Sequence, residues 1–115
     1  MKEENLILTK SYAFGLRIVK LYLHLQKKKV DLGLCSQILN SGTAIGANVE
    51  EAVGGISRKD FINKLQIAYK EARETRYWLR LLKDSEIMEK KLSESFLKDS
   101  LSSSFGVAMS SKVSA

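Results

Sequence analysis

Residues 57–83 read SRKDFINKLQIAYKEARETRYWLRLLK, and this stretch decides the fold. Apolar and small residues recur in it at alternating steps of four and three, the spacing of one face of an α-helix. They are Phe61, Leu65, Ala68, Ala72, Thr75, Leu79 and Leu82. Ser57 precedes Asp60 by three residues, an arrangement that resembles a capping box and marks a helix start. We therefore predict a helix over residues 58–83.

A helix predicted over residues 5–28 carries two apolar stripes. The first stripe is Ile7, Phe14, Ile18, Leu21 and Leu25. The second, beside it, is Leu6, Ala13, Leu16, Val19 and Leu23. A surface helix of a monomer needs one stripe to face its own core. The second stripe therefore predicts contact with another subunit.

Two more helices complete the prediction. Residues 34–53 follow a turn at 31–33, and their seam is Leu34, Ile38, Ser41, Ile45, Asn48 and Ala52. Glycine inside a helix costs roughly 1 kcal/mol relative to alanine, so Gly42 and Gly46 predict a neighbour packed very close. Gly54 and Gly55 end this helix, since either can adopt the left-handed conformation of a C-terminal cap. The last helix begins near Met88 and includes Leu92, Phe96, Leu97 and Leu101.

Four helices joined by short turns predict an all-α, antiparallel up-down-up-down four-helix bundle. The 115 residues contain no proline, which agrees with long helices and short turns. We assign residues 1–101 to the bundle and residues 102–115 to a serine-rich tail.

Few side chains in the sequence are suited to catalysis. The single histidine, His24, and the single cysteine, Cys35, form no metal-ligand cluster, and we interpret them as a surface and a packing residue. A di-metal bundle would need Glu-x-x-His on two helices, and none occurs. We expect no enzyme activity, no cofactor and no metal. With no run of eighteen apolar residues and no signal-peptide pattern, we also expect a cytoplasmic protein without a membrane partner.

Charge alternates along the chain, whose formal net charge is +6. Residues 1–30 contain seven Lys/Arg and two acidic residues. Residues 31–57 contain no Lys/Arg and three acidic residues, and residues 58–84 contain eight Lys/Arg and four acidic residues. Two predicted helices are therefore basic and suit an anionic partner. The candidate nucleic-acid contacts are Lys70, Arg73, Tyr77 and Arg80 on one face, and Lys27, Lys28 and Lys29 at a helix end. The three lysines also suit the helix dipole, the alternative reading of that cluster.

Residues 37–52 read QILNSGTAIGANVEEA, and with residues 57–82 they resemble the four-helix-bundle proteins encoded in intervening sequences of bacterial 23S ribosomal RNA genes. The resemblance covers roughly residues 10–84. Its motif residues are Ser41, Ile45, Gly46, Asn48, Glu51, Asp60, Phe61, Ala68 and Glu74. Asn40 stands where many members have an arginine, which removes one positive charge from this surface.

The resemblance implies a bundle that assembles into a ring-like homopentamer with no established enzymatic activity. Relatives that serve diversity-generating retroelements are basic pentamers, which implies nucleic acid and a reverse transcriptase as partners. From the residues, we expect Asn48 to hydrogen-bond across helices and Glu51 to cap or pair with the start of the next helix, with ligand binding as the alternative for both. The function predicted is a homo-oligomeric nucleic-acid-binding accessory protein, and the alternative is an assembly or protein-interaction scaffold.

Overall fold

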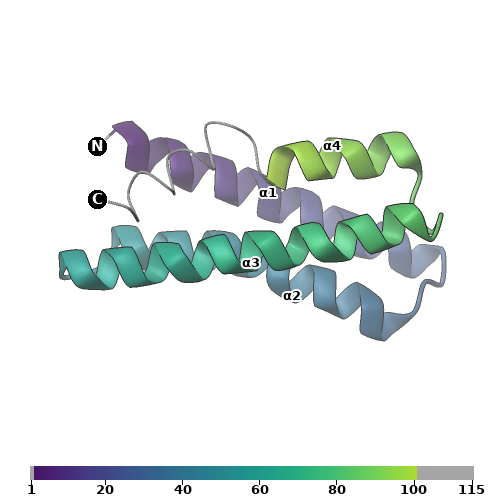
Figure 1. The fold of residues 1–115 in the computed structure, drawn as a ribbon, viewed down its shortest axis with the longest axis horizontal. Helices are drawn as coiled ribbons and strands as arrows, with labels where there is room; N and C mark the ends of the chain where they lie inside the picture. Colours follow the sequence, from purple (N-terminus) through teal and green to yellow (C-terminus); the bar gives the residue numbers. More distant parts are fainter. Residues whose placement is uncertain (1, 101–115) are drawn as a thin grey trace.

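The computed structural model describes residues 2–100, which form four α-helices and no strand (Figure 1). The helices are α1 (Lys2–Lys27), α2 (Leu32–Val53), α3 (Arg58–Asp84) and α4 (Lys90–Ser100). The all-α prediction is confirmed, and the bounds of α1, α2 and α3 lie within three residues of those predicted. The predicted helical residue Leu101 and the serine-rich tail, residues 102–115, lie outside the described residues.

The helix α2 packs between α1 and α3, and α4 packs mainly against α3 (Figure 1). Ser41 of α2 contacts Thr75 of α3, whereas Glu51, further along α2, contacts Lys64, earlier in α3. Residue numbers therefore rise along α2 as they fall along α3, so these two helices run in opposite directions. This order brings Ser41 and Glu51 of α2 against the first two-thirds of α3.

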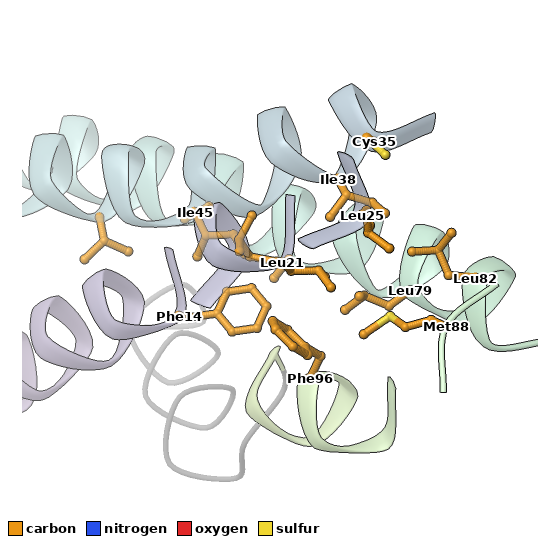
Figure 2. Close-up of a cluster of buried hydrophobic side chains, with 14 of the residues drawn as sticks. Phe14, Leu21, Leu25, Cys35, Ile38, Ile45, Leu79, Leu82, Met88 and Phe96 are labelled. Carbon is orange, nitrogen blue, oxygen red and sulfur yellow. The ribbon is translucent and has the colours of Figure 1, made fainter. Parts of the chain in front are cut away.

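The core follows the predicted seams of α1 and α3. The five residues of the first α1 stripe are all buried, and so are six of the seven seam residues of α3. Phe61 at the start of that seam is half-buried. Phe14 of α1 meets Phe96 of α4 edge to face, with ring centroids 6.3 Å apart, and Met88 closes the same end of the core (Figure 2). These contacts join all four helices into one hydrophobic cluster.

The seam predicted for α2 is confirmed at Ile38, Ser41, Ile45 and Ala52 and is wrong by one residue at Leu34 and Asn48. Cys35 and Val49 are fully buried, whereas Leu34 and Asn48, which we had placed on the seam, are only half-buried. Two neighbouring rows of residues along this helix, one beginning at residue 34 and the other at residue 35, both have helical spacing and share residues 38, 45 and 52. Spacing alone therefore cannot decide which row is buried. Val49 fits the core because burying an aliphatic side chain is more favourable than burying an amide.

Asp31 is the N-cap of α2, not part of a three-residue turn as we predicted. Its carboxylate accepts a hydrogen bond of 3.0 Å from the backbone N–H of Leu34, so Leu32 and Gly33 belong to the helix. The cap predicted at Ser57 is confirmed, because the Ser57 hydroxyl accepts a bond of 3.1 Å from the Asp60 N–H. Both caps satisfy amides that the first turn of a helix leaves unpaired.

The left-handed cap predicted at Gly54 or Gly55 is also wrong. Gly54 has φ −82°, and no described glycine has a positive φ. The left-handed positions are instead Lys29 (φ 60°) and Glu86 (φ 63°), just after α1 and α3. At Lys29, the next N–H bonds to the Leu25 carbonyl and the Lys29 N–H bonds to the Gln26 carbonyl, which is a Schellman motif. Glu86 forms the same pair of bonds, and α4 begins at Lys90, two residues after the predicted start near Met88.

Candidate nucleic-acid interface and apolar face

The predicted basic face of α3 is present and longer than expected. Lys70, Arg73, Tyr77 and Arg80 are all exposed, on the side of α3 opposite its buried residues. The same spacing of three and four continues towards the start of the helix through three further exposed residues, Lys59, Asn63 and Gln66. We call these seven residues the basic row. Our prediction from the sequence ended at Lys70 and left out these three residues, although the spacing identifies them and Lys59 is itself a cation.

The cations of the basic row have no ion-pair partner among the described residues. The ion pairs there are Arg17–Asp99, Lys64–Glu51 and Lys83–Glu94, and none includes a residue of the row. Lys64 shows the contrast. Its ammonium donates a hydrogen bond to the Glu51 carboxylate 2.8 Å away, which raises the pKa of Lys64 above its ordinary value. The four row cations instead are exposed and form no ion pair within residues 2–100, so their charges remain available to a phosphate backbone.

Tyr77 is held in a fixed orientation on the basic row. Its side chain is 52% exposed, and its ring lies edge to face with the ring of Trp78, with centroids 5.2 Å apart at 72°. Trp78 packs against the core, so it holds Tyr77 in place. A fixed, half-exposed aromatic ring between Arg73 and Arg80 can stack on a base or sugar beside bound phosphates.

Lys27, Lys28 and Lys29 are exposed where α1 ends. Figure 1 shows that the end of α1 and the end of α3 lie at the same end of the bundle. Because α2 packs between α1 and α3, the two basic clusters do not merge along the length of the molecule.

The second apolar stripe of α1 is exposed, as predicted. With Tyr12, which the sequence analysis left out, its large residues are exposed by 40–64%. They are Leu6, Tyr12, Leu16, Val19 and Leu23, which we call the apolar face. Beside it a hollow of about 510 Å³ opens between α1 and α2, with Tyr12, Leu16 and Val19 on one side and Thr43 and Glu50 on the other. The surface is therefore both apolar and concave, which favours a protein partner.

Small residues bring α1 and α2 together beneath this hollow. A Cβ atom added to Gly42 would lie 2.7–2.9 Å from the side chain of Ile18. One added to Gly46 would lie 3.2 Å from the backbone oxygen of Ser11. The close neighbour predicted from these two glycines is therefore confirmed, and it is α1.

The residues on which the family resemblance rests mostly build helix contacts. Ser41 accepts a buried hydrogen bond of 2.9 Å from the Thr75 hydroxyl. Asn48 donates to the Ala44 carbonyl of its own helix at 2.8 Å, so the predicted bond across helices is wrong for Asn48 and is made by Ser41. Ile45 and Ala68 are buried, Phe61 and Glu74 are half-buried, and Gly46, Glu51 and Asp60 make the contacts given above.

Glu51 pairs with α3, as expected, but not at the start of that helix. Its partner is Lys64, further along the helix. Glu50, the neighbouring acid, lines the hollow on the α1 side of α2 instead of facing α3. Consecutive residues on a helix point about 100° apart, so two adjacent acids cannot both face α3.

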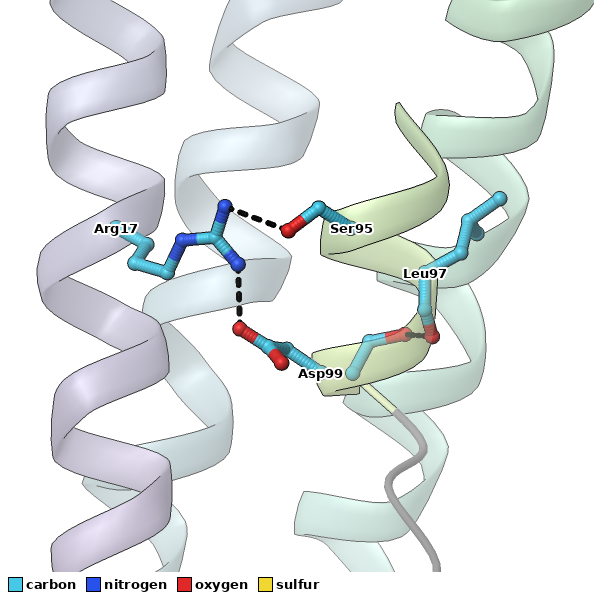
Figure 3. Close-up of polar contacts among 5 residues, drawn as sticks. Arg17, Ser95, Leu97 and Asp99 are labelled. Atoms are coloured by element: carbon cyan, nitrogen blue, oxygen red, sulfur yellow. Dashed lines mark hydrogen bonds and ion pairs between the residues drawn. The ribbon is translucent and has the colours of Figure 1, made fainter. Parts of the chain in front are cut away.

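A cluster around Arg17 attaches α4 to α1 (Figure 3). The Arg17 guanidinium pairs with the Asp99 carboxylate, donates to the Ser95 hydroxyl at 3.1 Å and lies 4.0 Å over the ring of Phe96. The sequence analysis did not identify this role, because the partners lie about 80 residues away along the chain. Arg17 is therefore one cation of α1 that is used within the fold.

The side chains considered for catalysis do not gather into a site. His24 is exposed, and Cys35 is buried with its sulfur 3.8 Å from the Val30 carbonyl. Within residues 2–100, no group of three or more His, Cys, Asp or Glu side chains could hold a metal ion. None of the helices in this range is long and apolar enough to cross a membrane.

The fold and its surfaces define a small helical-bundle protein that presents one basic and one apolar surface and no cluster of catalytic side chains among the described residues. Residues 3–104 match the family model of the 23S rRNA-intervening sequence protein, so the chain belongs to this family. A solved structure of a protein of unknown function from the S23 ribosomal protein family of Bacteroides thetaiotaomicron is similar, with 42% identity and a TM-score of 0.91. The match covers 98% of this chain and 99% of that one. No curated protein sequence matches the chain.

Proposed function

We propose that the chain is a non-enzymatic accessory protein of the cytoplasm that assembles with copies of itself and binds nucleic acid. Each copy is an up-down-up-down bundle, and the copies form a ring-like homo-oligomer, a pentamer by resemblance to the family. The observation that carries the proposal is the basic row, a line of cations with no partner among the described residues. The apolar face supports the assembly.

The exposure of the apolar face supports an apolar partner. Five side chains exposed by about half on average leave uncovered the equivalent of roughly two and a half large apolar side chains. Covering them contributes about 4–7 kcal/mol, at about 1.5–3 kcal/mol for each fully buried side chain. Association itself costs about 4–15 kcal/mol. One apolar face alone therefore does not offset that cost, and the surface that covers it must be apolar as well, as another copy of this chain is.

Binding is tested by fluorescence polarisation with a structured RNA and a DNA duplex at low and high salt. We expect binding that is micromolar or tighter at low salt and that weakens steeply as salt is added. The variant Lys70→Glu/Arg73→Glu/Arg80→Glu should lose it. The matched control is Lys90→Glu/Lys91→Glu/Lys98→Glu on α4, whose side chains are also exposed. Three reversals lower the formal net charge from +6 to 0 in both variants, so only the position of the charge differs.

Equal losses in the two variants would mean that net charge, and not the basic row, determines binding. Absence of binding at low salt would overturn nucleic-acid binding altogether. The hollow beside the apolar face then favours the second candidate, a scaffold that recruits a protein partner. That function predicts a partner that co-purifies after nuclease treatment and that still binds the Lys70→Glu/Arg73→Glu/Arg80→Glu variant.

A further inference from the structure

The basic row and the apolar face lie on different sides of the bundle. The helix α2 packs between α1, which bears the apolar face, and α3, which bears the row. Figure 1 shows α3 at the front and α1 further from the viewer. The row also points away from the core, because the buried residues of α3 occupy its opposite side. A copy that covers the apolar face therefore leaves the row uncovered.

The chemistry of the row also keeps it outside a subunit contact. Lysine is depleted from the cores of protein interfaces, and like charges brought together repel. From Lys59 to Arg80 the row spans 21 residues, about 32 Å at 1.5 Å per residue, and it contains four cations and no acid. About ten base pairs of a duplex have the same length at 3.4 Å per pair. One row thus matches one turn of a duplex and no more.

We infer that the assembled protein holds a nucleic-acid duplex along its outer surface, across the rows of two or more copies, so that assembly sets the strength of binding. This inference rests on the proposed function, since it takes both self-assembly and nucleic-acid binding from it. Once one row has bound the duplex, binding of a second row of the same oligomer is an intramolecular step. This raises the affinity by about 10²–10⁴ without any new contact within a copy.

The salt dependence of the binding affinity shows how many rows contact the duplex. Each neutralised phosphate contributes about −0.9 to the slope of log affinity against log salt concentration on a DNA duplex. One row with four cations gives a slope of about −3 to −4, and two rows give about −7. The slope is therefore a count of engaged copies that does not depend on the absolute affinity.

The experiment uses DNA duplexes of 10 and 40 base pairs, with fluorescence polarisation for affinity and light scattering for mass. Wild type is compared with Leu16→Gln/Leu23→Gln, which makes the apolar face polar without changing the charge. Circular dichroism and thermal melting check that this variant folds. We expect equal affinity of both proteins for the short duplex. For the long duplex, wild type should bind at least 100-fold tighter than the variant. The slope of log affinity against log salt concentration should be near −7 for wild type and about −3 to −4 for the variant.

If light scattering gives wild type and the variant different masses while both bind the long duplex with equal affinity and slope, that result would overturn this inference but not the proposal that the protein binds nucleic acid. No binding of either duplex at low salt would instead overturn the proposed function. A wild type that is a single copy at every concentration would overturn the assembly on which both rest. Should the variant not fold, dilution of wild type replaces it, and the advantage of the long duplex must disappear as the particles dissociate into single copies.

Discussion

The α2–α3 pair and the α1–α4 pair are held together in different ways. The helices α2 and α3 meet along most of their length, with a buried hydroxyl pair at Ser41 and Thr75 and an ion pair at Glu51 and Lys64. The 11-residue α4 packs mainly against α3, where Lys83 pairs with Glu94, and it is joined to α1 by Phe96 and the polar contacts of Arg17. The difference indicates that the basic row is carried by the most firmly packed helix, whereas α4 is a separately attached part that can open first.

Removing a side chain from the core of α3 should have the largest effect. Leu79 is fully buried, and Leu79→Ala leaves a cavity in the hydrophobic core, so we expect a loss of about 3 kcal/mol in the free energy of unfolding. The control is Leu81→Ala, two residues away and 41% exposed, which should change stability by about 0.5 kcal/mol or less. Urea denaturation measures both. A loss under about 1 kcal/mol for Leu79→Ala would contradict the tight packing of this pair.

Replacing Arg17 should loosen α4 without loosening α2 and α3. Arg17→Met keeps the apolar stem but removes the ion pair, the bond to Ser95 and the cation–π contact, which together contribute about 1–2 kcal/mol on a side chain that is one-third exposed. Native-state hydrogen exchange should accelerate in α4 alone. The control is Lys20→Met, since Lys20 is exposed and has no polar partner among residues 2–100. Faster exchange throughout the bundle would show that α4 is not a separate unit.

The sequence predicts some contacts of the bundle better than others, for a physical reason. The seam of α3 and the cap at Ser57 depend on local spacing, so a single sequence is enough to identify them. The seam of α2 fails at Asn48 and Val49, because two adjacent lines of residues have the same helical period. The Arg17 cluster depends on residues 78 and 82 positions away, and no local rule connects them. The basic row was found in part, and the missing members follow from period instead of charge.

The buried bond between Ser41 and Thr75 should show energetic coupling across α2 and α3. Ser41→Ala or Thr75→Val removes the same interhelical hydrogen bond, so each costs about 1 kcal/mol, and the double variant should cost little more than either single one. Ser11→Ala is the control, because the Ser11 hydroxyl is buried but bonds to Leu8 within its own helix. Additive losses in the Ser41 and Thr75 variants would mean that this bond does not fix the register.

The smallest expected effect is a gain in stability at the left-handed residues that end α1 and α3. Lys29→Gly and Glu86→Gly relieve a strain of roughly 1–2 kcal/mol, less the roughly 0.5–1 kcal/mol that glycine loses through the greater freedom of the unfolded chain, so each should stabilise by about 0.5 kcal/mol. Lys27→Gly, inside α1, is the control and should destabilise by up to about 1 kcal/mol.

The gains in stability from Lys29→Gly and Glu86→Gly should also be observed in different parts of the bundle. Lys29 joins α1 to α2, so its gain should raise the midpoint of global urea unfolding, whereas Glu86 precedes α4, so part of its gain should appear as slower hydrogen exchange in α4. Equal gains in global unfolding, with no change in the exchange of α4, would place α4 in the same cooperative unit as α2 and α3.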